Sequence, residues 1–600
     1  MKNQTTSITL PLIIVCSIIF TVVSLCGSLV GATVYYVDSI SGDDGDDGTT
    51  INSAWQTFEA IHNKIYGAEA FIAGDSILFK RGQSWQGNRL AIEEIHGTAS
   101  SPIIFGAYGA GAKPVFNLIV PQNLSWEHQS DNIWKASNPP GYHPERLLKN
   151  GVEILRANNS GELGSTFLWL YEVTDSSNEL YLYSLDDPGD ATIEYNAVNP
   201  NNSNASLSPI IISDSSHILI ENLDIQGGWT GIHITEGVNN IRIYNLQIGK
   251  YSSNGINIYS GENIVIDNCD FNNHFTLDYS MGATTRESSK RGSGDGIVIY
   301  GLAEGVIKHS SFTNWGHASI NIDGGPEIQV SGVRIFDNTL TSPDICYGGR
   351  IAVDDAHHCE LFNNRIIDTS VQSQLNGHSN HYHHNIFINT RSSPLNINNE
   401  IDAGIDVADY SNTAVYGNTY ENNLVANTEG VGIQLSGNNL RPVHDNIFRN
   451  NIVYNCGLLP IPRISGIGIT IASNEDPDIP TSDNHFLTNL VYNDNTEDTY
   501  SFRGTISNAK GFNQFNGSDG FTLADNIGAN PLFKDMENGD YQLEKASPCR
   551  NAGTETLAIL DYYGNTVPIG IRPDIGIHEL NELSSILLFI PALLHLRDAE

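Results

Sequence analysis

Basic residues are scarce in this chain. Its 600 residues include 30 Lys and Arg against 68 Asp and Glu, which gives a formal net charge of −38. Proteins that bind nucleic acid neutralise phosphates with clustered Lys and Arg, so the composition argues against a nucleic-acid partner. An acidic surface also repels polyanions at long range unless local cations offset it.

Cysteine is scarce as well. Five cysteines lie beyond residue 32, at Cys269, Cys346, Cys359, Cys456 and Cys549. This odd number at wide spacing does not form the framework of a disulfide-rich protein. The chain also lacks the paired Cys and His spacing of a zinc finger.

Long apolar runs are confined to the two ends. A positively charged start precedes an apolar segment at about residues 8–25, and small residues follow as far as Ala32. We expect residues 1–32 to be a signal peptide cleaved after Ala32, so that the protein is secreted, periplasmic or held at the cell surface; an uncleaved anchor is the alternative. The apolar tail 583–600 is short and contains Pro591, so we expect no stable membrane span after cleavage.

What the chain has in abundance is a short block, Gly-Ile-x-Ile, with close variants. Apolar residues alternate with others in each block, which is the periodicity of a β-strand. The block occurs at residues 231–234, 255–258, 296–299, 319–322, 350–353, 404–407, 432–435 and 466–469.

A second block lies between the first ones and repeats at a fixed distance. Its asparagines, Asn222, Asn245 and Asn268, are 23 residues apart. Short strands in fixed order within such a period describe one coil of a solenoid. Asparagine suits the turns because it tolerates left-handed φ and can satisfy buried backbone groups along a stack. A β-sandwich would instead show hairpin turns every 8–12 residues or so, and we predict an all-β parallel β-helix.

Segments at both ends of the chain resemble the right-handed parallel β-helix proteins of the pectin-lyase-like superfamily. They are residues 35–38, 55–58, 74–82 and 102–109 at the opening and 530–533, 539–543 and 573–579 at the close. The resemblance implies a right-handed parallel β-helix with an amino-terminal cap. We divide the chain into a signal peptide (1–32), a cap with the first coils (33–120), a small β-rich insertion (121–208), a central β-helix (209–500), carboxyl-terminal coils with a closing segment (501–582) and an apolar tail (583–600).

A β-helix core is packed shut, so a ligand must bind on its outer surface. In each Gly-Ile-x-Ile block, the x position and the residue after the block point outward. Polar and aromatic side chains there suit sugar hydroxyls and ring faces. The residues that we expect to bind substrate in a groove on this face are His233, Asn257, Asn321, Tyr259 and Tyr300.

Ionisable groups concentrate on three consecutive coils. The residues that we expect to be catalytic lie at or beside the ends of the strands of these coils. They are Asp295, His317, Asp323, Arg350 and Asp354. A long loop, residues 272–293, would wall the groove and supply positive charge. The further substrate-binding residues predicted here are His357, Arg286, Lys290 and Arg291.

Three of these positions partly resemble the polygalacturonase-type glycoside hydrolases, whose successive coils carry Gly-Asp-Asp, Gly-His-Gly and Arg-Ile-Lys. This chain has Ser-Gly-Asp295-Gly, Trp-Gly-His317-Ala and Gly-Arg350-Ile-Ala. Gly296 replaces the second aspartate and Ala352 replaces the lysine. The resemblance therefore implies roles for Asp295, His317 and Arg350 only, and it leaves the acid pair incomplete.

Two reactions remain open, both on a polysaccharide. Hydrolysis needs one carboxyl to protonate the leaving oxygen and another to act on water or the sugar. Elimination needs a base and a cation beside a uronate, and Asp323, Asp354 and Asp355 would then hold Ca²⁺. A non-catalytic glycan-binding or adhesion protein is the rival, and we expect a monomer in either case. The histidine-rich stretch 378–384 could bind a metal, but we favour a stack of polar turns there.

Overall fold

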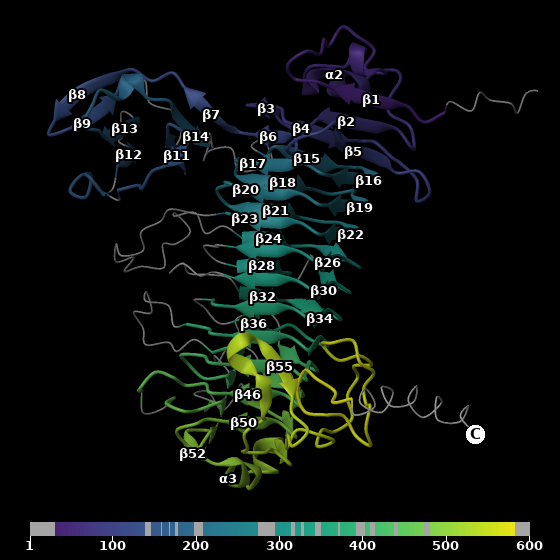
Figure 1. Cartoon of the computed structure of the whole chain (residues 1–600), viewed down its shortest axis with the longest axis vertical. Coiled ribbons are helices and arrows are strands. Elements are labelled where there is room, and N and C mark those ends of the chain that lie inside the picture. The colour runs from purple at the N-terminus through teal and green to yellow at the C-terminus, as the bar shows by residue number, and fades with distance from the viewer. Residues whose placement is uncertain are drawn as a thin grey trace, which may run out of the picture.

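Successive coils of the chain stack along one axis (Figure 1). The computed structural model describes residues 31–137, 144, 146–157, 159–166, 168–173, 178–196, 208–273, 295–313, 318–325, 329–341, 350–369, 373–391, 403–408, 414–436, 442–461, 464–472 and 481–581. Three long sheets, which we call sheets 1, 2 and 3, surround one apolar core. Almost all their strands pair in parallel, and the chain is a right-handed parallel β-helix, as predicted.

Sheet 1 contains the Gly-Ile-x-Ile strands. Its order is β4 (Leu90–Glu93), β15 (Ile210–Ser213), β18 (Thr230–Ile234), β21 (Asn254–Ile258), β24 (Asp295–Ile299), β28 (Ala318–Asp323), β32 (Arg350–Asp354), β36 (Ser373–Leu375), β39 (Ile405–Ala408), β43 (Ile433–Ser436), β47 (Ile469–Ile471), β51 (Tyr500–Phe502) and the antiparallel β52 (Thr505–Ser507).

Sheet 2 has shorter strands. Its order is β3 (Ser84–Gln86), β6 (Val115–Asn117), β17 (Asp224–Gln226), β20 (Gln247–Gly249), β23 (Asp270–Asn272), β27 (Ser311–Thr313), β31 (Thr339–Thr341), β35 (Arg365–Ile367), β38 (Ile386–Ile388), β42 (Leu424–Ala426), β46 (Ile452–Tyr454) and β50 (Leu490–Tyr492).

Sheet 3 is the longest and is interrupted within some coils. Its strands are β1 (Val34–Val37), β2 (Ser76–Lys80), β5 (Ile103–Tyr108), β16 (Ser216–Glu221), β19 (Asn239–Tyr244), β22 (Glu262–Asp267), β25 (Leu302–Ala303), β26 (Val306–Lys308), β29 (Val330–Ser331), β30 (Arg334–Phe336), β33 (Ala356–His357), β34 (Glu360–Phe362), β37 (His381–His383), β41 (Thr419–Glu421), β45 (Ile447–Arg449), β49 (His485–Leu487) and β53 (Thr522–Ala524). A three-stranded extension beside it holds β40 (Val415–Tyr416), β44 (Val443–His444) and β48 (Thr481–Ser482).

The repeat predicted the register of sheet 1. The apolar partners on successive strands form one column at Ile232, Ile256, Ile297, Ile320 and Ile351. All of them are at most 1% exposed. Removing each such side chain from water stabilises the fold by roughly 1.5–3 kcal/mol, so the column is a large part of the driving force for stacking.

Asparagine plays two roles at the corner between sheets 3 and 2. Asn222, Asn245 and Asn268 have φ of 61°, 53° and 55°, so the predicted left-handed turns are present. The backbone groups, however, are satisfied one residue further along the coil. There, from Asn338 onward, each asparagine Oδ1 accepts from the backbone N–H of the asparagine one coil before it.

The part of the chain between β6 and β15 forms two antiparallel sheets of its own, which lie beside the first coils (Figure 1). Their strands are β7 (Ile119–Gln122), β8 (Trp126–Ser130), β9 (Ile133–Ala136), β10 (Leu147–Lys149), β11 (Val152–Glu153), β12 (Trp169–Val173), β13 (Asn178–Tyr183) and β14 (Ile193–Asn196). Buried Arg146 joins them to the helix, since its guanidinium donates to Asn273 Oδ1 at 2.9 Å and pairs with Glu153 at 3.0 Å.

Both ends of the core are covered. Near the amino end, α2 (Phe58–Ile65) buries Phe58, Ile61 and Ile65. At the other end, α3 (Ala509–Asn513) stacks Phe512 on Tyr500 with the ring centroids 4.7 Å apart. None of the helices in the described residues is long and apolar enough to cross a membrane.

A closing segment then returns along the outer face of sheet 2 (Figure 1, yellow). Its strands are β54 (Phe533–Asp535) and β55 (Asp540–Leu543). Leu543, Cys549 and Ile577 pack on Leu424 and Ile452 of the sheet. The four cysteines within the described residues are free and buried. The remaining short 3-10 turns are η1 (Ile51–Ser53), η2 (Pro188–Asp190), η5 (Ser518–Gly520) and η6 (Met536–Asn538).

Candidate functional site

The outer face of sheet 1 carries the first outward column that the sequence predicted. The observed column is His233, Asn257, Val298, Asn321, Ala352, Gln374, Asp406 and Gln434. Gln374 was missed because β36 lacks the Gly-Ile-x-Ile pattern. Val298 and Ala352 are each 1% exposed although they lie outside the apolar core. This face is therefore shielded from solvent at its centre.

A second outward column begins one residue after each block. Tyr259 and Tyr300 lie one coil apart in it, since their backbone amides donate to Ile234 and Ile258 of the preceding coils, both at 2.9 Å. On the next two strands of the sheet, Asp323 of β28 lies beside its register partner Asp354 of β32. Asn376 follows, and its amide donates to Asp354 Oδ1 at 2.9 Å.

Asp354 and Asp323 are neighbours with different surroundings. Asp323 is exposed at the end of β28, whereas Asp354 is partly buried. Burial raises the pKa of Asp354 to about 6, and the negative charges of Asp323 and Asp355 act in the same direction. The amide of Asn376 and the guanidinium of Arg350 oppose this rise. Asp354 therefore keeps its proton to near-neutral pH.

Tyr300 links these carboxylates to Asp295. Burial raises the pKa of the Tyr300 hydroxyl, and the charges of Asp323 and Asp295 raise it further. Asp295 itself is 6% exposed. One of its oxygens accepts from the backbone N–H of Ala318 at 3.0 Å and the other from Asn321 Nδ2 at 3.3 Å. With both oxygens engaged, Asp295 holds the start of β28 in place.

Two other predicted residues stand beside this group. Asn257 lies in the first outward column, and its buried Oδ1 has no hydrogen-bond partner within the part of the chain that the structure describes. His233 is two coils before Val298, and burial lowers its pKa, so its ring is neutral at pH 7. Both side chains offer neutral polar atoms to a ligand on this face.

The structure does not bring His357 to this face. Asp355 has a left-handed φ of 50° and turns the chain, so that His357 begins the next face on β33 of sheet 3. There its ring stacks on His378 with the centroids 5.0 Å apart. His317, Arg286, Lys290 and Arg291 lie outside the described residues.

The possible calcium site at Asp323, Asp354 and Asp355 remains a prediction. Asp323, Asp354 and Asp355 are not among the described side chains that bring three possible metal-ligating atoms within 4.8 Å of one another. Asp355 occupies the turn after β32. Among the described residues, Glu360, His381 and His383 on sheet 3 do bring three such atoms together.

A separate hollow opens at the corner between sheets 2 and 3. Its lining includes Lys113, Asn245, Asp270, His309 and Asp337. It is polar and wide open, and it contains none of the residues predicted to act on a substrate. The carboxylates of sheet 1 therefore remain the candidate site.

Comparisons with known proteins agree with the fold. The model of the right-handed β-helix region matches residues 274–423. A lacto-N-biosidase of Bifidobacterium longum subsp. longum is 33% identical over 129 residues, which are 21% of this chain and 8% of that protein.

Two solved structures are similar at low identity. The GH136 lacto-N-biosidase from Eubacterium ramulus is 16% identical with a TM-score of 0.38, over 76% of this chain and 68% of its own. A complex of XylC with xylose is 13% identical with a TM-score of 0.47, over 92% of this chain and 98% of its own. The fold itself rests on the strand pairing of this chain and on the matching family model.

Proposed function

We propose that this chain is a glycosidase that hydrolyses a neutral glycan on the outer face of sheet 1. The observation that carries the proposal is the pairing of Asp354, which stays protonated to about pH 6, with exposed Asp323 on the adjacent strand. Glycosidases use two carboxyl groups in just such different states, one to donate a proton and one to attack or activate water.

Asp354 is the proton donor in this proposal. A carboxyl group with its pKa near the working pH is both protonated and able to release its proton to the leaving oxygen. Asn376 donates to Oδ1 of Asp354 and leaves the other oxygen to carry the proton. The groups around the acid, rather than the acid alone, set its protonation state.

Asp323 is the second carboxylate. Neighbouring strands of a sheet are about 4.8 Å apart, so two carboxyl groups in one column are close together. Inverting enzymes separate theirs by about 6.5–9.5 Å to admit a water, whereas retaining enzymes use about 5–5.5 Å. The column spacing favours attack by Asp323 on the sugar and retention of configuration.

The local charge favours a neutral substrate over a uronate. Asp295, Asp323, Asp354 and Asp355 share this face with Arg350, so carboxylates outnumber cations among the described residues here. Elimination would require a cation to neutralise the uronate carboxylate. Neutral sugars can instead stack on Tyr259, which is 42% exposed, and donate a hydroxyl to Asn257 Oδ1.

Sequence similarity supports a glycosidase in general terms. The pattern around Asp295 and Arg350 partly resembles polygalacturonase-type hydrolases, and part of the chain matches a lacto-N-biosidase. The same proposal places the protein outside the cytoplasm, because its apolar amino-terminal segment ends in small residues at Ala32.

A screen of neutral and acidic glycans would test the reaction. We expect new reducing ends without the ultraviolet absorbance of an unsaturated product. Asp354→Asn and Asp323→Asn should each lower turnover by about 100-fold or more. Asp445→Asn is the matched control, because Asp445 is exposed in the turn after β44 of the extension and asparagine tolerates its left-handed φ.

The pH profile separates the two roles. A proton donor works only while protonated, so turnover should fall as pH rises through about 6, the pKa of Asp354. Asp354→Asn should remove that limb. Glycan binding without release of reducing ends, and with unchanged behaviour of both aspartate variants, would instead support a non-catalytic glycan-binding protein.

A further inference from the structure

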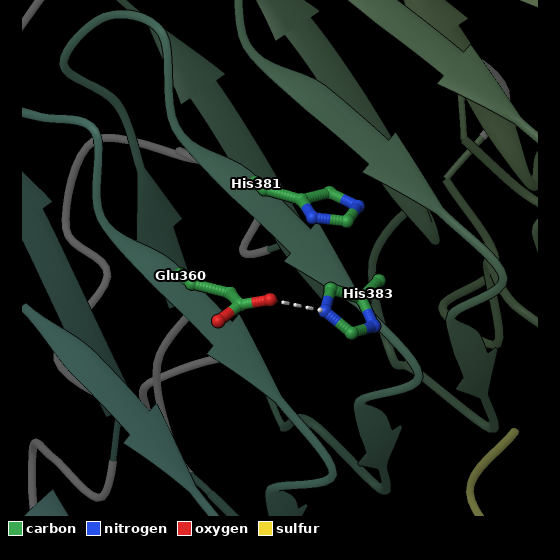
Figure 2. A group of neighbouring side chains, drawn as sticks. All are labelled: Glu360, His381 and His383. Atoms are coloured by element: carbon green, nitrogen blue, oxygen red, sulfur yellow. Dashed lines mark hydrogen bonds and ion pairs between the residues drawn. The ribbon is translucent and has the colours of Figure 1, made fainter. Parts of the chain in front are cut away.

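Three potential metal-binding side chains meet on the outer face of sheet 3 (Figure 2). Glu360 lies on β34, and His381 and His383 lie on β37, the next strand of the sheet. Each offers one ligand atom, and these atoms lie within 4.8 Å of one another. The stretch that the sequence suggested to be a turn is thus a strand, which points both histidines to the same side.

Each of the three side chains is oriented by a partner behind it. Glu360 Oε2 pairs with Arg334 at 2.8 Å, which leaves Oε1 beside His383. His381 Nε2 contacts Glu421 Oε1 at 2.7 Å, and His383 Nδ1 lies 3.0 Å from His384 Nδ1. Metal sites in proteins show this arrangement, in which the second nitrogen of a ligating histidine is held by a carboxylate or another polar group.

The protonation states also suit a cation. Burial lowers the pKa of His383, so its ring is neutral at pH 7. The hydrogen bond from His383 and the charge of Arg334 lower the pKa of Glu360 to about 2, so it is a carboxylate. The rings of His381 and His383 stack with their centroids 4.1 Å apart, a distance at which two imidazolium charges would repel.

We propose that Glu360, His381 and His383 bind a zinc ion that joins two successive coils of the β-helix. Two imidazole nitrogens and one carboxylate oxygen suit zinc, whereas calcium and magnesium prefer oxygen ligands alone. Zinc binds nitrogen and oxygen at about 2.0–2.2 Å, so three atoms within 4.8 Å of one another are near enough to share one ion. The side chains of Glu360 and His381 are 35% and 19% exposed, so the ion can enter from solvent.

The site is separate from the proposed glycosidase. Its residues belong to sheet 3, whereas Asp323 and Asp354 belong to sheet 1. Its effect is on stability, because an ion that binds only the folded chain stabilises it by mass action. Glu421 and Arg449 extend the network by two more coils, since their side chains pair at 2.6 Å. The competing interpretation is a set of ion pairs that holds no metal.

Zinc titration of the full chain, first stripped with a chelator, would test the site. We expect one zinc per chain by elemental analysis and a raised melting temperature. His381→Asn and His383→Asn should each weaken binding by about 10-fold or more, as should Glu421→Gln, which removes the group behind His381. His444→Asn is the control, because His444 is a partly exposed histidine on the extension beside the same sheet.

Cobalt gives a readout that does not depend on the variants. Co²⁺ substituted for zinc in the wild-type chain should show the intense visible bands of a four-coordinate nitrogen and oxygen site. Absence of stoichiometric zinc in the folded wild type would overturn the proposal. So would equal zinc affinity in the His381, His383 and His444 variants.

Discussion

The same corner of the β-helix is built in two ways in its two halves. In the early coils, the residue after the left-handed turn is apolar, at Leu223, Leu246 and Cys269. In the later coils, the same position is an unbroken ladder of Asn338, Asn364, Asn385, Asn423, Asn451, Asn489 and Asn526. Apart from Asn526, which is 5% exposed, these asparagines are at most 2% exposed, so both columns are buried.

The difference shows that a buried column can be polar if every member has its partners. Each ladder amide donates to a backbone carbonyl and to the next asparagine, and each Oδ1 accepts in turn. The last of them, Asn526, donates to Asn513 of α3, so the series ends on a partner. An apolar column needs no such continuity, because dispersion contacts are not directional.

The core beside the corner changes two coils after the ladder begins, since Ile335 and Leu361 are still aliphatic and Tyr382 is the first aromatic residue to follow them. Aliphatic Ile243, Ile266 and Ile307 give way to aromatic rings in the later coils. Tyr382, Tyr420, Phe448 and Phe486 stack with successive centroid distances of 4.9, 4.5 and 4.4 Å. In this column, the later coils thus combine the hydrogen-bonded ladder with stacked rings, whereas Ile243, Ile266 and Ile307 of the early coils pack as aliphatic side chains.

Breaking the ladder should have the largest effect. Asn451→Leu introduces the residue of the early half into the later half and leaves the buried backbone N–H of Asn423 without an acceptor. With the lost amide bonds, we expect a cost of about 3–5 kcal/mol. Hydrogen exchange followed by mass spectrometry should show faster amide exchange in the later coils alone. An equal increase of the exchange rate along the whole chain would contradict the idea that the two halves are stabilised separately.

Removing a buried charge in the later half should come next. Burial raises the pKa of Glu421, but His381 and Arg449 lower it more, to about 2. A pKa below the usual 4.5 stabilises the fold above pH 4.5, and this stability is lost as pH falls toward 2.

Glu421→Gln in metal-free buffer should therefore cost about 3 kcal/mol at pH 7, because it leaves Arg449 without its buried partner. Urea unfolding as a function of pH should show the difference from wild type shrinking below pH 4.5. A difference independent of pH would mean that Glu421 acts through packing alone.

The reciprocal exchange should cost somewhat less. Leu246→Asn puts an amide between Leu223 and Cys269, where the adjoining members of the column are apolar. A buried amide without partners costs about 1–3 kcal/mol. We expect unfolding of the early coils at lower urea, detected by their exchange rates. Wild-type stability in this variant would show that the polar ladder can extend into the early half.

Removing one ring from the aromatic stack should have the smallest effect on the free energy of unfolding. Phe448→Leu keeps an apolar side chain but removes ring contacts with Tyr420 and Phe486. Aromatic pairs contribute about 0.5–1.5 kcal/mol beyond burial, so a loss of about 1–2 kcal/mol is expected. The matched change Ile243→Leu in the early half should cost less than about 1.5 kcal/mol, because it conserves volume. Equal costs would remove stacking as a distinction between the halves.

The sequence predicted the coils better than it predicted the corners. Gly-Ile-x-Ile repeats fix strand register because each slip would expose a column of isoleucines. The repeat did not reveal that the asparagine ladder lies one residue after the left-handed turns, since asparagine occupies both positions in some of the later coils, as at Asn422 and Asn423. It also missed Gln374, whose strand reads Ser-Gln-Leu.

The sequence predicted which residues of the candidate site lie beside each other, but it did not predict their protonation states. The spacing placed Asp323 beside Asp354, but the raised pKa of Asp354 comes from burial on the outward side. His357 was misplaced because the turn at Asp355 is not marked by glycine or asparagine. Glu360 could not be joined to His381 from the sequence, since that pairing follows from the register of β34 and β37.

The closing segment has a mechanical consequence. It binds the flank of the β-helix on successive coils, since Asn450 Nδ2 donates to the carbonyl of Thr554 and Asn422 Nδ2, one coil earlier, donates to the carbonyl of Gly576. Tension applied at the carboxyl end would therefore load the middle of the rod instead of its final turn. The β-helix therefore resists unfolding from its carboxyl end, because the closing segment must detach before the last coils can separate.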